Sequence, residues 1–302
     1  MGEGVLLVVT DTTPRLTWNL IADLAAIFQY QFMDNAYMAG TVVAIVAGAI
    51  GYFVVLRGSA FAAHALSHIG FAGATGAVVL AINPIFGLLA FTMGSGMVIG
   101  ALGSRLRSRD VTIGIVLAWT LGLGVLFISL YTGYAQEAYA LLFGEILGIS
   151  VQEVVVTAVV AGLALVALVA MYRPLLYASV DQDLALAKGV PTVALSVAFM
   201  AVLALAVTDA VQVVGVLLIF ALIVTPAAIA IRFTTRPRLA ITTAVGLSLA
   251  FTWLGLAVAY YSPHPVSFFI TSLAFGTYVV VRALEALRAR GARPTSSRPA
   301  SA

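Results

Sequence analysis

The chain contains no cysteine among its 302 residues. It can therefore form neither a disulfide nor a thiolate metal site, which leaves imidazole and carboxylate groups as the available metal ligands. Charged residues are also scarce, at 9%, whereas 62% of the residues are hydrophobic. Soluble globular domains carry about 25% charged residues, so this composition excludes them and predicts a polytopic membrane protein.

Two sequence motifs are also absent. The chain has no G-x-x-x-x-G-K-[ST] phosphate-binding loop, so any process driven by ATP requires a separate ATPase subunit. Residues 1–17 carry Glu3 and Asp11 ahead of the first basic residue, Arg15, and they lack the basic and apolar regions of a secretory signal. We expect residues 1–17 to form a disordered leader and the first membrane span to direct targeting.

Nine apolar segments have the length and composition of membrane spans, and they predict an all-α, polytopic transmembrane bundle of about eight or nine helices. The segments cover residues 36–56, 60–82, 86–102, 111–131, 151–171, 192–207, 211–231, 239–260 and 266–281. The segment 18–33 is expected to form an interfacial or additional helix. Residues 18–285 are therefore predicted to form one transmembrane domain, followed by a disordered basic cytoplasmic tail at 286–302.

The distribution of basic residues predicts the orientation of the bundle. If the loop at Arg57 is cytoplasmic, strict alternation of the nine spans places every Lys and Arg except Arg15 on the cytoplasmic side. This asymmetry follows the positive-inside rule and predicts a multi-pass cell-membrane protein, surrounded by lipid, with a cytoplasmic C-terminus. It also accounts for the net charge of +3 without any nucleic-acid partner.

Two of the three histidines lie in the second span. His64 and His68 are four residues apart and share one face of a helix, and His68 lies about 16 Å beyond Arg57, near the middle of the bilayer. An ionisable pair at this depth is costly and indicates function, and two imidazoles at this spacing can share a metal ion. A neutral, hydrogen-bonded pair without a ligand is the structural alternative. Ala65, rather than Glu, follows His64, which argues against a zinc peptidase.

Two ligands are too few to hold a dehydrated divalent ion. A second copy of the chain, related by a two-fold axis beside the second span, would bring the number of imidazoles to four. Such a set suits zinc and also accepts manganese, nickel or cobalt. The histidine pair therefore predicts a metal site at a dimer interface.

The longest polar interruption between spans is the segment 172–191. It contains DQDLALAK, which predicts a short helix that Gly189-Val190-Pro191 would end. We expect this loop to be cytoplasmic and to dock an ATPase subunit, with an ordinary solvated connector as the alternative. The residues expected to carry this coupling are Asp181, Asp183, Leu184, Lys188 and Gly189.

Two further positions are candidates for moving or binding a cation. Asp209 falls in a polar Thr208-Asp209 pair that predicts a brief break between spans on the outer side. It is either a helix cap or a second cation contact. Pro226 lies within the seventh span and should kink it, which makes it a candidate gate element.

Five segments, in order along residues 30–285, resemble the permease subunits of zinc/manganese ABC importers. They are QYQFMDNAYMAGTVVAIVAGAIGYFVVLRG, FAAHALSHIGFAG, LLFGEILGIS, VDQDLALAKGVP and VVGVLLIFALIVTPAAIA. The resemblance implies an all-helical permease that is not itself an enzyme and works as a homodimer or heterodimer. It also implies two partners, a cytoplasmic ATP-binding cassette subunit that hydrolyses ATP and an extracytoplasmic metal-binding protein.

The same resemblance implies a role for each histidine. In the family the second-span motif usually reads Asp-Ala-x-Ser-His, and its acid and histidine bind the metal. By position, His68 matches the family's histidine and His64 stands where the acid would be. Imidazole in place of carboxylate favours zinc as the transported ion, with manganese next.

The sequence thus predicts the membrane permease of an ATP-driven divalent-metal importer. Three other functions stay open at this point. The chain could be an ABC permease for a metal chelate such as a siderophore or corrinoid, a metal-dependent intramembrane enzyme, or a proton-coupled carrier. The enzyme reading lacks a general base near the histidines, and the carrier reading would need no ATPase.

Overall fold

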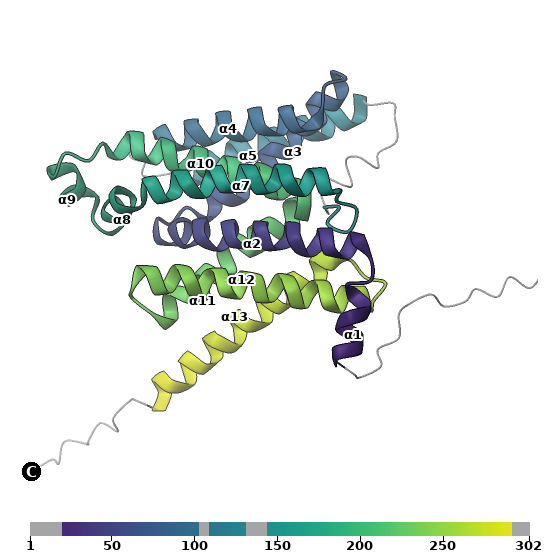
Figure 1. The fold of residues 1–302 in the computed structure, drawn as a ribbon. Coiled ribbons are helices and arrows are strands. Elements are labelled where there is room, and N and C mark those ends of the chain that lie inside the picture. The colour runs from purple at the N-terminus through teal and green to yellow at the C-terminus, as the bar shows by residue number, and fades with distance from the viewer. Residues whose placement is uncertain (1–19, 103–108, 131–143, 292–302) are drawn as a thin grey trace, which may run out of the picture.

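The computed structural model describes residues 20–102, 109–130 and 144–291, and these ranges contain twelve helices and no strand (Figure 1). The expected leader at 1–17 and the last residues of the expected tail, 292–302, lie outside the described ranges. The helices are α1 (Leu20–Ile27), α2 (Gln31–Leu56), α3 (Ala60–Val79), α4 (Pro84–Leu102), α5 (Arg109–Leu130), α7 (Val151–Ala170), α8 (Tyr172–Val180), α9 (Gln182–Ala187), α10 (Thr192–Val214), α11 (Val216–Phe233), α12 (Pro237–Tyr260) and α13 (Val266–Gly291). The predicted all-α fold class is confirmed.

Eight of these helices are long and apolar enough to cross a membrane, namely α2, α4, α5, α7, α10, α11, α12 and α13. Helix α3 has 20 residues, which at about 1.5 Å per residue also suffices for a crossing. It is outside the apolar set because His64 and His68 lower its hydropathy. The helix with the candidate metal ligands is therefore less apolar than the eight other long helices named above.

The centre of the bundle is formed by α2 and α10. In each of these helices 72% of the apolar stretch is buried, against 17% in the peripheral helix α5. Helix α2 packs on α7, α11 and α12, whereas α3 packs mainly on α4 and α5. The aromatic rings of Phe53 and Phe199 are fully buried between α2 and α10, with their centroids 6.4 Å apart.

Glycines let several helices approach more closely than other residues would allow. A Cβ atom on Gly73 of α3 would lie 2.2 Å from the carbonyl oxygen of Gly87 in α4, and one on Gly87 would lie 2.1 Å from the carbonyl oxygen of Gly73. A Cβ on Gly51 of α2 would lie 2.0 Å from the carbonyl oxygen of Ile223 in α11. Within lipid, helices associate through close van der Waals packing rather than through the hydrophobic effect, and small residues at the contacts make that packing possible.

The expected break at Thr208-Asp209 is wrong. Helix α10 continues through both residues to Val214, and the chain breaks instead at Gly215, which has φ of 82°. Two adjacent polar residues are typical of a loop, but both side chains have hydrogen-bond partners inside the bundle. The hydroxyls of Thr208 and Thr92, for example, lie 2.7 Å apart. Gly215 ends the helix because glycine adopts positive φ without steric cost.

The segment 18–33 is divided between two helices. Helix α1 has eight residues and spans about 12 Å, which is too short to cross the bilayer. It lies at the end of the bundle opposite α8 and α9 (Figure 1). The hydroxyls of Tyr260 and Tyr261, which follow each other at the end of α12, donate to the carbonyl oxygens of Ala26 (3.2 Å) and Asp23 (2.8 Å) and fasten α1 there.

Candidate functional site

The two histidines of α3 lie side by side. Their ring centroids are 4.6 Å apart, with the ring planes inclined by 75°, as the spacing of one helical turn requires. Phe61, His64 and His68 form the stripe on which this part of α3 is accessible, whereas Ala63 and Leu66 beside them are almost completely buried. The two imidazoles are therefore the polar groups on the part of α3 that is accessible at the surface of the protomer.

One nitrogen of the histidine pair has no hydrogen-bond partner among the described residues. The ring of Phe220, from α11, lies 4.9 Å from the ring of His64 and covers one of its edges. The Nδ1 atom of His64 is buried and has no hydrogen-bond partner in the part of the chain that the structure describes. Ser67 donates to the carbonyl oxygen of Ala63 within the same helix, so its hydroxyl is already engaged. An imidazole nitrogen without a partner is suited to bind a cation.

The described part of one protomer contains no complete set of metal ligands. Across residues 20–102, 109–130 and 144–291, no three His, Asp or Glu side chains come together in a way that could hold a metal ion. Neither Asp209 nor any other described acid joins His64 and His68 as a third ligand. Since zinc takes four ligands and manganese more, further ligands must come from water or from a second chain.

The segment from Tyr172 to Pro191 forms two short helices, α8 and α9, which project from one end of the bundle (Figure 1). Asp181 begins α9, and its Oδ1 atom accepts a hydrogen bond from the backbone N–H of Leu184 at 2.9 Å. Gly189, with φ of 77°, ends this turn of the chain. The Lys188 ammonium lies 5.6 Å from the ring centroid of Tyr177, so α9 folds back on α8.

Most side chains of α9 are exposed. Leu184 and Leu186 are 49% and 51% exposed, and Asp183 is exposed between the cap and these leucines. Ala185 is buried and holds the other side of the helix against the bundle. The short helix that the sequence predicts is present, and it combines apolar and charged groups on one accessible surface.

Asp209 is buried inside α10, at 6% exposure, and its carboxyl group is hydrogen-bonded to Thr157 of α7. Thr157 and Gln212 line a cavity of about 420 Å³, whose wall also includes Glu145 and Glu153. The Glu153 carboxylate accepts hydrogen bonds from both the backbone N–H and the hydroxyl of Ser150, which caps α7. Asp209 is therefore not a helix cap but a buried carboxyl group behind a polar cavity.

Pro226 lies inside α11 and is buried. It has no N–H to donate to the carbonyl oxygen of Leu222, so one helical hydrogen bond is missing at this point. The neighbouring carbonyl of Ile223 faces Gly51 of α2 at the closest contact between these two helices. The weakened turn of α11 thus lies where α11 meets the central helix.

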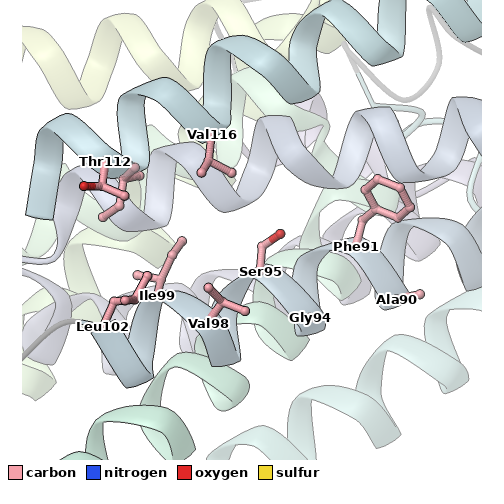
Figure 2. A pocket seen from close by; sticks show the side chains of 10 residues that line it. Ala90, Phe91, Gly94, Ser95, Val98, Ile99, Leu102, Thr112 and Val116 are labelled. Atoms are coloured by element: carbon pink, nitrogen blue, oxygen red, sulfur yellow. The ribbon is translucent and has the colours of Figure 1, made fainter.

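A second cavity, of about 370 Å³, opens between α4 and α5 (Figure 2). Its wall is formed by Phe91, Val98, Ile99, Leu102 and Val116 together with smaller residues, and the hydroxyl of Ser95 points into the gap. No histidine, acid or base contributes to this wall. It is an apolar groove that offers a cation nothing to bind.

Three sets of contacts around these residues could not be found from the sequence: those of Phe220 with His64, of Thr157 with Asp209, and of Arg57 with two serines. Phe220 covers His64 from 156 positions away, and Thr157 bonds Asp209 from another helix. Arg57 was noted for its charge, but its guanidinium reaches the hydroxyls of Ser179 and Ser196. No pattern in the sequence pairs residues so far apart, although the isolated Arg57 at the end of an apolar run was a signal.

Eight long apolar helices, packed with one helix that carries a polar pair and with short exposed helices at one end, indicate a multi-pass membrane protein. The chain belongs to the ABC 3 transport family, whose model matches residues 29–285. This match covers α2 to α12 and most of α13, including the histidine pair and the α8–α9 segment.

Relatives and a solved structure support this assignment. The chain is 30% identical over 214 residues to the manganese transport system membrane protein MntC of Listeria monocytogenes, covering 70% of this chain and 76% of that one. It is 34% identical over 203 residues to the manganese import system permease protein ScaB of Streptococcus parasanguinis, covering 67% and 72%. The structure of PsaBC from Streptococcus pneumoniae in complex with Fab superposes with a TM-score of 0.77 at 27% identity, covering 87% of this chain and 95% of that chain.

The predicted family is therefore confirmed. The chain is the permease subunit of a metal-ion ABC importer, and it is not itself an enzyme because a separate subunit supplies the ATPase. The rival assignments as an intramembrane enzyme and as a proton-coupled carrier are not supported by this family membership.

Proposed function

We propose that this permease passes a divalent transition-metal ion through a site formed by His64 and His68. The observation that carries the proposal is the geometry of the pair, with ring centroids 4.6 Å apart on the accessible stripe of α3 and the Nδ1 atom of His64 buried without a partner among the described residues. An ionisable pair in a membrane-crossing helix that is otherwise apolar is costly unless it has a function.

Zinc is the proposed ion, because imidazole ligands without a carboxylate suit zinc better than harder ions. Manganese is the second candidate, since the similar permeases of Listeria monocytogenes and Streptococcus parasanguinis are named for manganese. The two ions differ in the number of ligands that they require, so the completed site decides between them.

The proposed site is completed by a second copy of the chain. Each protomer presents two imidazoles on an accessible stripe and no third ligand in the described ranges. A two-fold axis beside α3 would bring two such stripes together and give four imidazoles, which is the ligand number of zinc. A homodimer explains why the ligands lie at the surface of the protomer rather than inside it.

The α8–α9 segment is the proposed docking site for the ATP-binding cassette subunit. Five residues form or border the short helix that projects from the bundle, namely Asp181, Asp183, Leu184, Lys188 and Gly189. Basic residues such as Arg57, Arg173 and Arg232 share this end with it, which supports a cytoplasmic orientation for this end and for the C-terminus. The metal-binding protein would then deliver the ion at the opposite end, where α1 lies.

The test is metal accumulation by cells that express the permease with its ATPase and binding protein. We expect the His64→Ala/His68→Ala double variant to lose accumulation of one metal at matched expression in the membrane, and that metal is the substrate. His264→Ala is the control, because His264 lies in an exposed loop and is bonded to Ser262. Unchanged accumulation of both zinc and manganese in the double variant would refute the histidine site and favour a permease for a metal chelate.

A further inference from the structure

The link between α2 and α3 joins two helices that share few contacts with each other. Helix α2 packs on α7, α11 and α12, whereas α3 packs mainly on α4 and α5 and touches α2 little. The link has three residues, Arg57, Gly58 and Ser59, and Gly58 adopts φ of 61° with open space around its missing Cβ. Such a short, locally permissive link lets α3 move relative to α2 without bending either helix.

The side chain of Arg57 ties this link to two further elements. Its Nη1 donates to the hydroxyl of Ser179 in α8 at 3.4 Å, and its Nη2 donates to the hydroxyl of Ser196 in α10 at 3.3 Å. Its Cζ lies 5.4 Å from the ring centroid of Phe199, one turn after Ser196. A guanidinium is planar and carries its donors in a fixed fork. A displacement of α8 or α10 would therefore pull on the Arg57 side chain and shift the backbone of the link.

Ser179 is placed to connect Arg57 with α9. Its hydroxyl donates to the carbonyl oxygen of Leu175 at 2.5 Å, which leaves its oxygen free to accept from Arg57. Two residues later Asp181 caps α9, the helix proposed to dock the ATPase. In the other direction, His64 lies in the first turns of α3, seven positions after Arg57. Arg57 therefore lies between the proposed dock and the proposed metal site, in contact with the chain on both sides.

We propose that Arg57 is a positioning residue that couples movement of the α8–α9 segment to α3 and so to the histidine pair. This inference rests on the proposed function. When the ATPase displaces α8, the Arg57 fork shifts the 57–59 link and with it the start of α3, which carries the histidine pair. The bonds to the two serines are individually weak, so the fork can change partners during the cycle without a large barrier.

The test uses the complete transporter in proteoliposomes and measures zinc or manganese uptake together with ATP hydrolysis. We expect Arg57→Lys, which keeps the charge but replaces the fork by a point donor, to lower the ratio of metal uptake to ATP hydrolysis at least about fivefold. Assembly with the ATPase subunit and thermal stability should stay as in the wild type. Ser179→Ala should change the ratio in the same direction, and combining both substitutions should add little more.

Arg232→Lys is the matched control. Arg232 lies at the same end of the bundle, pairs with Glu285 at 2.7 Å and covers the ring of Tyr278, so its side chain joins α11 to α13 rather than α8 to the link before α3. Its substitution should leave the ratio of uptake to hydrolysis unchanged.

Three results would overturn the role of Arg57. An Arg57→Lys ratio equal to that of the wild type would do so, as would a parallel fall of uptake, assembly and stability, or an equal effect of Arg232→Lys. Failure of the proposed function has a different signature, because the wild-type transporter would then accumulate neither metal, or the histidine double variant would accumulate both.

Discussion

Gly73 and Gly87 face each other across the contact between α3 and α4, and each leaves the space in which the carbonyl oxygen of the other lies. A Cβ atom on either residue would come within 2.2 Å of that oxygen. The contact lies a little more than one turn beyond His68 and fixes the helix that carries the candidate metal ligands. The histidine site is therefore built on a backbone contact that only glycine permits.

Alanine at Gly73 should separate α3 from α4. We expect Gly73→Ala to lower the free energy of unfolding by about 1–3 kcal/mol, because overpacking forces the two backbones apart. The measurement is thermal stability of the purified protein in detergent. Gly94→Ala is the control within α4, since a Cβ at Gly94 meets nothing within 4 Å. Equal stability of the Gly73 variant and the wild type would contradict the close contact.

An acid at position 64 should change the preference between metals. We expect His64→Asp to shift the ratio of zinc to manganese uptake toward manganese by about tenfold, or ~1.4 kcal/mol, since carboxylate favours the harder ion. Uptake of both metals, supplied together at equal concentration, gives the ratio directly. A ratio that does not move would separate His64 from the metal and leave His68 to be tested alone.

The cap of α9 should matter more than its charge. Asp181→Ala removes the acceptor for the Leu184 N–H and should weaken α9 by about 1 kcal/mol, because a helix of six residues depends on its cap. We expect weaker binding of the ATPase subunit, measured by co-purification at graded concentrations. Asp181→Asn keeps the cap but not the charge and should bind normally. If the Asn variant fails as the Ala variant does, the charge itself contacts the ATPase.

The buried carboxyl group of Asp209 should contribute to binding of the cation during transport. Asp209→Asn retains the hydrogen bond to Thr157 but removes the charge, so the packing of α7 on α10 should persist. If Asp209 contacts the ion on its path, the metal concentration for half-maximal uptake should rise by about tenfold, which corresponds to ~1.4 kcal/mol. Thermal stability of the variant reports the packing separately. Unchanged uptake with reduced stability would assign Asp209 a structural role.

Much of the fold follows from the lengths of the apolar segments. The end of α2 at Leu56 and the start of α3 at Ala60 were predicted correctly, because Arg57 and Gly58 interrupt the apolar run. The start of α2 was placed too late, at Ala36. Asn35 is polar but buried, and its side-chain amide donates to the carbonyl oxygen of Ile149 at 3.0 Å. A tertiary hydrogen bond thus admits a polar residue that hydropathy assigns to a loop.

The same limit applies to the candidate site. The closeness of His64 and His68 follows from helix geometry, so the sequence could predict it. Thr208 and Asp209 were interpreted as a loop because their partners, Thr92 and Thr157, are on other helices. The bonds of Arg57 span 122 and 139 positions and depend on how α8 and α10 pack. Local patterns predict local geometry, whereas these contacts exist only in the folded bundle.

The modest hydropathy of α3 has a consequence for how the protein is made. Eight helices are long and apolar enough to cross a membrane, and α3, with its two histidines, is less apolar than they are. Four residues, Leu80 to Asn83, separate α3 from the strongly apolar α4. The short connection would let the two helices enter as a hairpin, in which α4 would cover one side of α3 as it does in the folded bundle. Biogenesis of the metal-binding helix would then depend on a neighbour that contributes no ligand.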